Sequence, residues 1–107
     1  CQKIVSELPK NVHVSFDIDG LSPDLCPSTG TPVPGGLSLD EAFTLLAVLR
    51  ESGRKLTSFD LCEVSPAASE NEWDANVGAR LLYKLIGFAL LSRGSARPDL
   101  PKAPGIR

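Results

Sequence analysis

A short pattern that occurs twice constrains the fold of this chain more than any other feature. Ser-Phe-Asp followed by an aliphatic residue stands at 15–18 and again at 58–61. Each copy lies in a segment of strand composition, 11–19 and 55–63, and each strand is followed by a helical pattern. The order strand, helix, strand, helix predicts right-handed crossovers, and therefore an α/β fold with a parallel sheet.

Alternation identifies the first strand, because every second residue is apolar: Val12, Val14, Phe16 and Ile18. The second strand has less regular apolar content, supplied by Leu56, Phe59 and Leu61. Two strands do not complete a parallel sheet, since such strands are normally buried on both faces. We therefore expect further strands, either from chain upstream or from another subunit.

Both helices carry start signals. Ser38 and Glu41 have capping-box spacing, and the helix that they open should end near Ser52, with Gly53 at its C-terminus. Ser69 and Glu72 form a similar pair before a second helix of about 20 residues. Helical spacing predicts that its apolar residues form one wide buried face: Val77, Leu81, Leu82, Leu85, Ile86, Phe88 and Ala89.

Proline and glycine mark the segments without regular structure. Residues 20–36 are too rich in both for a helix or strand, and long ordered loops of this kind are usually functional. Residues 95–107 contain three further prolines and should be irregular. We accordingly divide the chain into part of one domain, 1–94, and an irregular tail, 95–107.

Charge and cysteine content exclude several classes of protein. A net charge of −2 offers no basic surface for nucleic acid or an anionic membrane. The longest apolar run, 85–91, is far shorter than the ~20 residues that cross a bilayer. Cys1, Cys26 and Cys62 form no CxxC, which argues against disulfides and structural zinc and favours the cytoplasm. Because the chain begins without methionine, we expect it to be part of a longer protein.

Acidic residues end both strands. Asp17 and Asp19 are two apart on the predicted strand, so their carboxylates should project to one side. Two buried like charges need a compensating cation, which indicates a hard divalent metal, although both acids could instead cap the loop or face solvent. Glu63 could pair with a planar cation such as a guanidinium, or could be a surface acid or helix-dipole partner.

The remaining polar candidates have ordinary structural interpretations. We expect His13 to be packed and hydrogen-bonded, because it precedes the acids by several residues. Asp60 should accept hydrogen bonds from neighbouring backbone or from Ser58. Cys26 and Cys62 have no basic partner in the sequence and should be inert. Trp73 is expected to pack where the second helix begins.

Three blocks in order make a specific combination. They are Ser-Phe-Asp-Ile-Asp-Gly-Leu-x-Pro at 15–23, Pro-x-x-Gly-Thr-Pro-Val-Pro-Gly-Gly-Leu at 27–37 and Ser-Phe-Asp-Leu-x-Glu-Val-x-Pro at 58–66. Over residues 12–91 the chain resembles the ureohydrolase family, which includes arginase, agmatinase and formimidoylglutamase. The resemblance implies a three-layer α/β/α fold, homo-oligomers, and hydrolysis of a C–N bond in a small cationic guanidino or formimidoyl substrate.

The resemblance also implies site residues. Asp17 and Asp19 match aspartates that bind a binuclear manganese centre, and Glu63 and Thr31 match residues at the substrate end of the site. Ser22 departs from the family, which usually has aspartate there. The family's other metal ligands come from earlier His- and Asp-rich blocks, and the 107 residues contain none of these. The chain alone is therefore expected to be inactive. Whether the substrate is that of arginase, agmatinase or formimidoylglutamase stays open.

Two other functions compete with this interpretation. A non-catalytic homologue could keep the fold for assembly or regulation, and the missing ligand blocks would distinguish it from the enzyme. An unrelated α/β module could bind magnesium and phosphate through Asp17 and Asp19. The absence of a glycine-rich strand-to-helix phosphate loop argues against that module.

Overall fold

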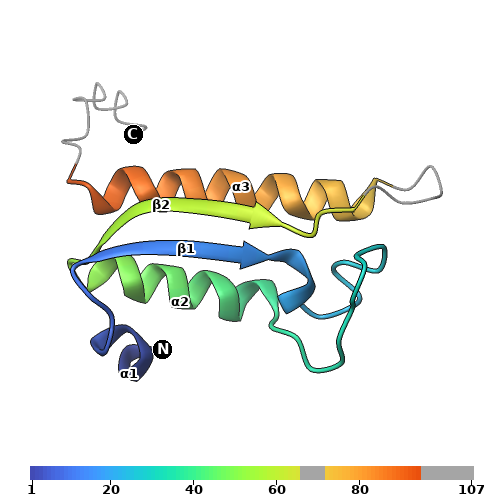
Figure 1. Cartoon of the computed structure of the whole chain (residues 1–107), viewed down its shortest axis with the longest axis horizontal. Helices are drawn as coiled ribbons and strands as arrows, with labels where there is room; N and C mark the ends of the chain where they lie inside the picture. The colour runs from blue at the N-terminus through green and yellow to red at the C-terminus, as the bar shows by residue number, and fades with distance from the viewer. Residues whose placement is uncertain (66–71, 95–107) are drawn as a thin grey trace, which may run out of the picture.

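The computed structural model describes residues 1–65 and 72–94 as a parallel strand pair with two long helices (Figure 1). The elements are α1 (Gln2–Ser6), β1 (Asn11–Asp17), the 3-10 turn η1 (Ile18–Gly20), α2 (Leu39–Glu51), β2 (Lys55–Cys62) and α3 (Trp73–Ser92). The predicted order of strands and helices and the parallel α/β class are confirmed. The short helix α1 was not predicted, because five residues carry too little periodicity to indicate a helix.

The register of the sheet places polar residues of one strand beside polar residues of the other, and apolar residues beside apolar ones. Val14 lies opposite Phe59, Ser15 opposite Asp60 and Asp17 opposite Cys62, after an irregularity between Val12 and His13. Because side chains alternate along a strand, one face of the pair is apolar and the other is polar.

Both long helices cover the apolar face. One core cluster combines α2, α3 and the residues after β1, with Phe16 and Leu61 of the strands packed against it: Ile18, Leu21, Cys26, Ala42, Val77 and Leu81. A second cluster joins α1, β1 and α2 through Val5, Val12 and Leu49. The described residues therefore form two layers, and they do not supply the third layer that the family resemblance implies.

Helix α2 has the predicted boundaries. The Glu41 amide donates to the Ser38 hydroxyl, and the Glu41 carboxylate accepts from the Ser38 amide, so both halves of the capping box are present. The chain leaves the helix through Gly53, whose φ of +79° lies in the region that glycine adopts most easily.

Helix α3 begins at Trp73 and buries a narrower face than predicted. Leu81 and Leu85 are fully buried, but Leu82 is 42% exposed and Ile86 is 45% exposed, so these two were predicted wrongly. Each lies about 100° around the helix from its buried neighbour, beyond the stripe that meets β2 and α2. Trp73, predicted to pack, is half exposed.

Some predictions fall on residues outside the described ranges. The tail, 95–107, and Ser69 of the second capping pair are among them. Among the described residues, no side-chain hydrogen bond caps α3 from Glu72. None of the described helices has both the length and the apolar character needed to span a bilayer.

Candidate functional site

The candidate site lies where the two parallel strands end. Strand β1 ends at Asp17, and Glu63 directly follows β2. The carboxyl ends of parallel strands share one edge, and ligands of open α/β sheets bind there. In Figure 1 the turn η1 and the long loop that follows it lie beyond the two arrowheads, at this same edge.

The two aspartates do not share a strand. Strand β1 ends two residues earlier than predicted, and Asp19 lies in η1, where the Leu21 amide donates to the Ile18 carbonyl at 3.0 Å. Ile18, the first residue of η1, is fully buried in the core. Side chains alternate regularly only along a strand. The prediction that alternation places the carboxylates of Asp17 and Asp19 on one side therefore does not apply, because Asp19 lies beyond the end of β1.

Asp17 lies beside polar side chains from β2. Its carboxylate and potential ligand atoms of Asp60 and Cys62 all lie within 4.8 Å of one another. The Cys62 thiol donates to Asp60 Oδ1 at 3.5 Å, and this hydrogen bond, with burial and the charges of Asp60, Asp17 and Glu63, raises the thiol pKa. The raised pKa agrees with the prediction that Cys62 is not a reactive nucleophile.

The loop between η1 and α2 is closed at its base. The Ser22 amide donates to the Leu37 carbonyl, and the Leu37 amide donates to the Gly20 carbonyl, both at 2.9 Å. Gly36 approaches this bridge so closely that a Cβ on it would lie 2.1 Å from the Leu21 oxygen. Gly36, the last glycine of the block at 27–37, therefore permits a backbone contact that no other residue allows.

Residues 29–31 connect the two strand ends. The Thr31 hydroxyl donates to Asp19 Oδ2 at 2.6 Å, and the buried Thr29 hydroxyl donates to the Glu63 carbonyl at 3.0 Å. A Cβ on Gly30 would lie 3.9 Å from Glu63 Oε2, so the Glu63 carboxylate faces this backbone. The structure thus brings the predicted residues Asp19, Thr31 and Glu63 together around one short segment.

Glu63 has an unusual backbone conformation. Its φ is +63°, in the left-handed region that non-glycine residues rarely adopt. Such strain persists where surrounding contacts fix it, and it is common at functional sites. The hydrogen bond from Thr29 to the Glu63 carbonyl is one such contact.

Two buried polar residues that contact or belong to the loop were given no role in the site from the sequence. Thr29 and Asp74 are buried, and Asp74 Oδ2 accepts the Ser28 amide at 2.9 Å. Asp74 would have been hard to identify, because an acid in the first turn of a helix is ordinary. Burial, followed by the nearby charge of Asp74, raises the pKa of the Cys26 thiol, which agrees with the prediction that Cys26 is inert.

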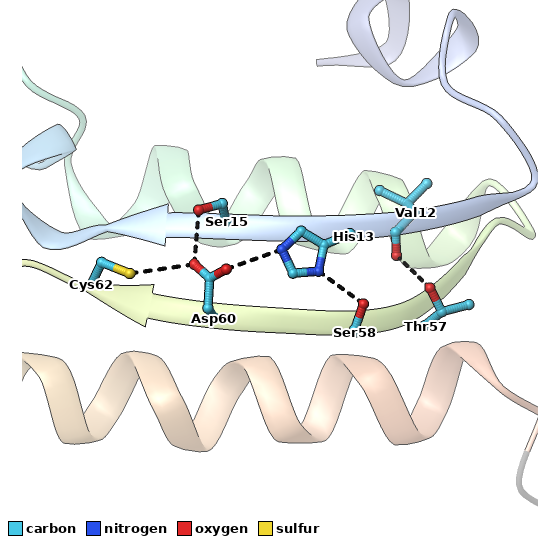
Figure 2. Close-up of polar contacts among 7 residues, drawn as sticks. All are labelled: Val12, His13, Ser15, Thr57, Ser58, Asp60 and Cys62. Carbon is cyan, nitrogen blue, oxygen red and sulfur yellow. Dashed lines mark hydrogen bonds and ion pairs between the residues drawn. The ribbon is translucent and has the colours of Figure 1, made fainter.

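A hydrogen-bonded network covers the polar face of the sheet, where Figure 2 shows it across both strands. His13 contacts Ser58 at 2.8 Å and Asp60 at 3.1 Å, and the Ser15 hydroxyl donates to Asp60 at 2.8 Å. His13 is hydrogen-bonded as predicted, but its side chain is 51% exposed and not packed. Asp60 accepts from Ser15, not from Ser58, and mainly this bond lowers the Asp60 pKa.

Known proteins are similar to this chain in sequence and in fold. Residues 1–87 match the arginase family model. The hepatic arginase of Aquarana catesbeiana is 40% identical over 83 residues, covering 78% of this chain and 25% of that protein. The N(1)-aminopropylagmatine ureohydrolase of Thermus thermophilus is 40% identical over 94 residues, covering 86% and 30%.

The solved structures agree with the sequence relatives. Arginase from Bacillus caldovelox superposes with a TM-score of 0.64 at 36% identity, over 80% of this chain and 28% of that chain. The chain therefore spans between 25% and 30% of the length of the relatives named here. The family match covers most of the chain, and the chain belongs to the arginase family.

Proposed function

We propose that this chain supplies part of the active site of a manganese-dependent ureohydrolase, which cleaves a C–N bond in a guanidino or formimidoyl substrate. The observation that carries the proposal is the segment 29–31. It contacts Asp19 through Thr31 and Glu63 through Thr29, and so ties an expected metal ligand to an expected substrate ligand.

The donor atoms fit a hard divalent cation. Asp17 is exposed and Asp19 is half-buried, and both offer carboxylate oxygens, the ligands that manganese prefers. Thr31 donates to one oxygen of Asp19 and leaves the other to coordinate. A bound cation of this kind supplies Lewis acidity, which lowers the pKa of water and polarises the group under attack. Two carboxylates do not complete a coordination shell, so the proposal assigns the other ligands to the rest of the whole protein.

Glu63 suits the cationic end of the substrate. A carboxylate can accept two parallel hydrogen bonds from a planar guanidinium, and its charge favours a cation over a neutral analogue. The left-handed backbone of Glu63, with the Thr29 contact, fixes the direction in which this side chain leaves β2. In the proposed reaction Glu63 orients the substrate, while Asp17 and Asp19 hold the metal.

Metal content and hydrolysis by the full-length protein test this proposal together. Asp17→Asn and Asp19→Asn should each lower the bound manganese per chain and reduce turnover of guanidino or formimidoyl substrates by at least about 100-fold. Asp24→Asn, which alters an exposed acid in the same loop, should leave both unchanged. Wild-type protein that neither binds manganese nor hydrolyses these substrates would instead support the non-catalytic homologue.

A further inference from the structure

Asp74 is a buried acid to which the proposed reaction gives no role. It lies in the first turn of α3 and is 1% exposed. Oδ2 accepts the Ser28 amide at 2.9 Å, and within the described residues Oδ1 has no hydrogen-bond donor. A carboxylate is costly to bury unless its contacts compensate for lost hydration. The hydrogen bond from the Ser28 amide is therefore the contact that explains a buried aspartate at position 74.

Ser28 begins the segment that reaches both halves of the site. The Thr29 hydroxyl, next along the chain, donates to the Glu63 carbonyl, and the Thr31 hydroxyl donates to Asp19. The segment 28–31 is thus held at three points, on α3, at the end of β2 and on η1. Of these three contacts, the one with Asp74 comes from outside the proposed metal and substrate ligands.

Helix α3 also holds the other side of the site. A Cβ on Gly78 would lie 3.0 Å from Val64, the residue that follows Glu63, so this backbone packs closely against the end of β2. Asp74 and Gly78 are four residues apart and therefore share one face of the helix. One helical turn thus fixes the loop through Asp74 and the Glu63 segment through Gly78.

We propose that Asp74 is a positioning residue for substrate binding, which sets the spacing between Asp19 and Glu63 by fixing residues 28–31 to α3. This inference rests on the proposed function of the site. Without the Asp74 contact, the segment loses its attachment to the helix, and the Thr29 bond that supports the strained Glu63 backbone weakens. The Glu63 side chain is then no longer held in one orientation toward the substrate.

Amide exchange and kinetics of the full-length protein test this role. Asp74→Ala should speed amide exchange at Ser28 by about tenfold or more. At saturating manganese it should raise KM about tenfold with a smaller change in kcat, because the loss falls on substrate binding. Asp74→Asn keeps an oxygen that accepts the Ser28 amide, so the amide exchange rate at Ser28 and KM should both stay within about threefold of wild type. Glu72→Gln removes an exposed acid from the same helix start and should change neither.

The outcomes separate the inference from the proposed function. Wild-type exchange at Ser28 and wild-type KM in Asp74→Ala would overturn the inference, as would a lower melting temperature with both values unchanged. Should Asp74→Ala fail to fold, Asp74→Leu carries the same test, since it keeps a buried side chain of similar shape and removes the oxygen that accepts the Ser28 amide. If wild-type protein hydrolyses no guanidino or formimidoyl substrate while exchange at Ser28 responds, the proposed function fails and the attachment of the loop stands.

Discussion

At the scale of single residues, the hydroxyl of Thr31 makes the shortest polar contact of the site, 2.6 Å to Asp19 Oδ2. A donor that orients a metal-binding carboxylate typically contributes 10- to 100-fold in metal affinity. Thr31→Val should therefore weaken manganese binding by about tenfold or more, as measured by titration of the full-length protein. Thr31→Ser keeps the donor and should bind nearly as tightly as wild type.

A matched variant separates this contact from a general effect of losing a hydroxyl. Thr44 is exposed in the middle of α2, and Thr44→Val should leave manganese affinity unchanged. Equal weakening in Thr31→Val and Thr44→Val, or none in either, would contradict a role of Thr31 in orienting Asp19.

At the scale of elements, the loop depends on the closed base between η1 and α2. Gly36→Ala places a methyl group 2.1 Å from the Leu21 carbonyl oxygen, so the bridge between Leu21 and Leu37 must open. We expect a loss of about 1–3 kcal/mol in the free energy of unfolding, the usual cost of overpacking. Denaturant unfolding measures this loss.

The control for this variant lies in the same bridge. A Cβ on Gly20 would meet nothing within 4 Å, and Gly20 has no positive φ that would strain another residue. Gly20→Ala should therefore unfold at nearly the wild-type denaturant concentration. A Gly36→Ala protein as stable as Gly20→Ala would show that the loop base tolerates a side chain.

At the scale of the whole molecule, stability should depend on acid pH. Hydrogen bonds hold the pKa of Asp60 below its ordinary value of 3.8, mainly from Ser15, and that of Glu41 below 4.5, through Ser38. A carboxyl whose pKa is lowered by folding stabilises the protein above its unfolded pKa, and this contribution is lost as pH falls through the folded value.

We therefore expect these contributions to be constant above about pH 4.5 and to disappear below it. Asp60→Asn and Glu41→Gln should each lower the melting temperature near pH 7 and flatten its fall at acid pH. A variant with the same acid dependence as wild type would show that the carboxylate it replaces does not contribute to that dependence.

An apolar cavity of about 480 Å³ lies along the outer edge of β1, the edge that is not paired with β2. Its lining comes mainly from α1, β1 and α2, including Val14 and Leu45, and also from Leu8, Gly20 and Leu37. A parallel strand is normally flanked on both sides. The further strand that the incomplete sheet led us to expect stays a prediction, and this edge of β1 is a place for it.

The sequence by itself determined the order of the two strands and the two long helices, their parallel pairing, and the helix α2 with both its ends. These follow from local chemistry, because alternation, capping and glycine act over a few residues. The three motif blocks also indicated the family, since their residues and spacing are read directly from the chain. The same blocks selected Asp17, Asp19, Thr31 and Glu63 as candidates, and the structure places them at one edge of the sheet.

Only the tertiary structure decided how those candidates are arranged. The end of β1 at Asp17, the left-handed backbone of Glu63 and the burial of Asp74 depend on contacts between segments that lie 30 or more residues apart, such as Thr29 with Glu63 and Ser28 with Asp74. The exposure of Leu82 and Ile86 likewise depends on which neighbours cover α3. Local patterns identify which residues can bury or bind, but packing between distant segments fixes which of them do.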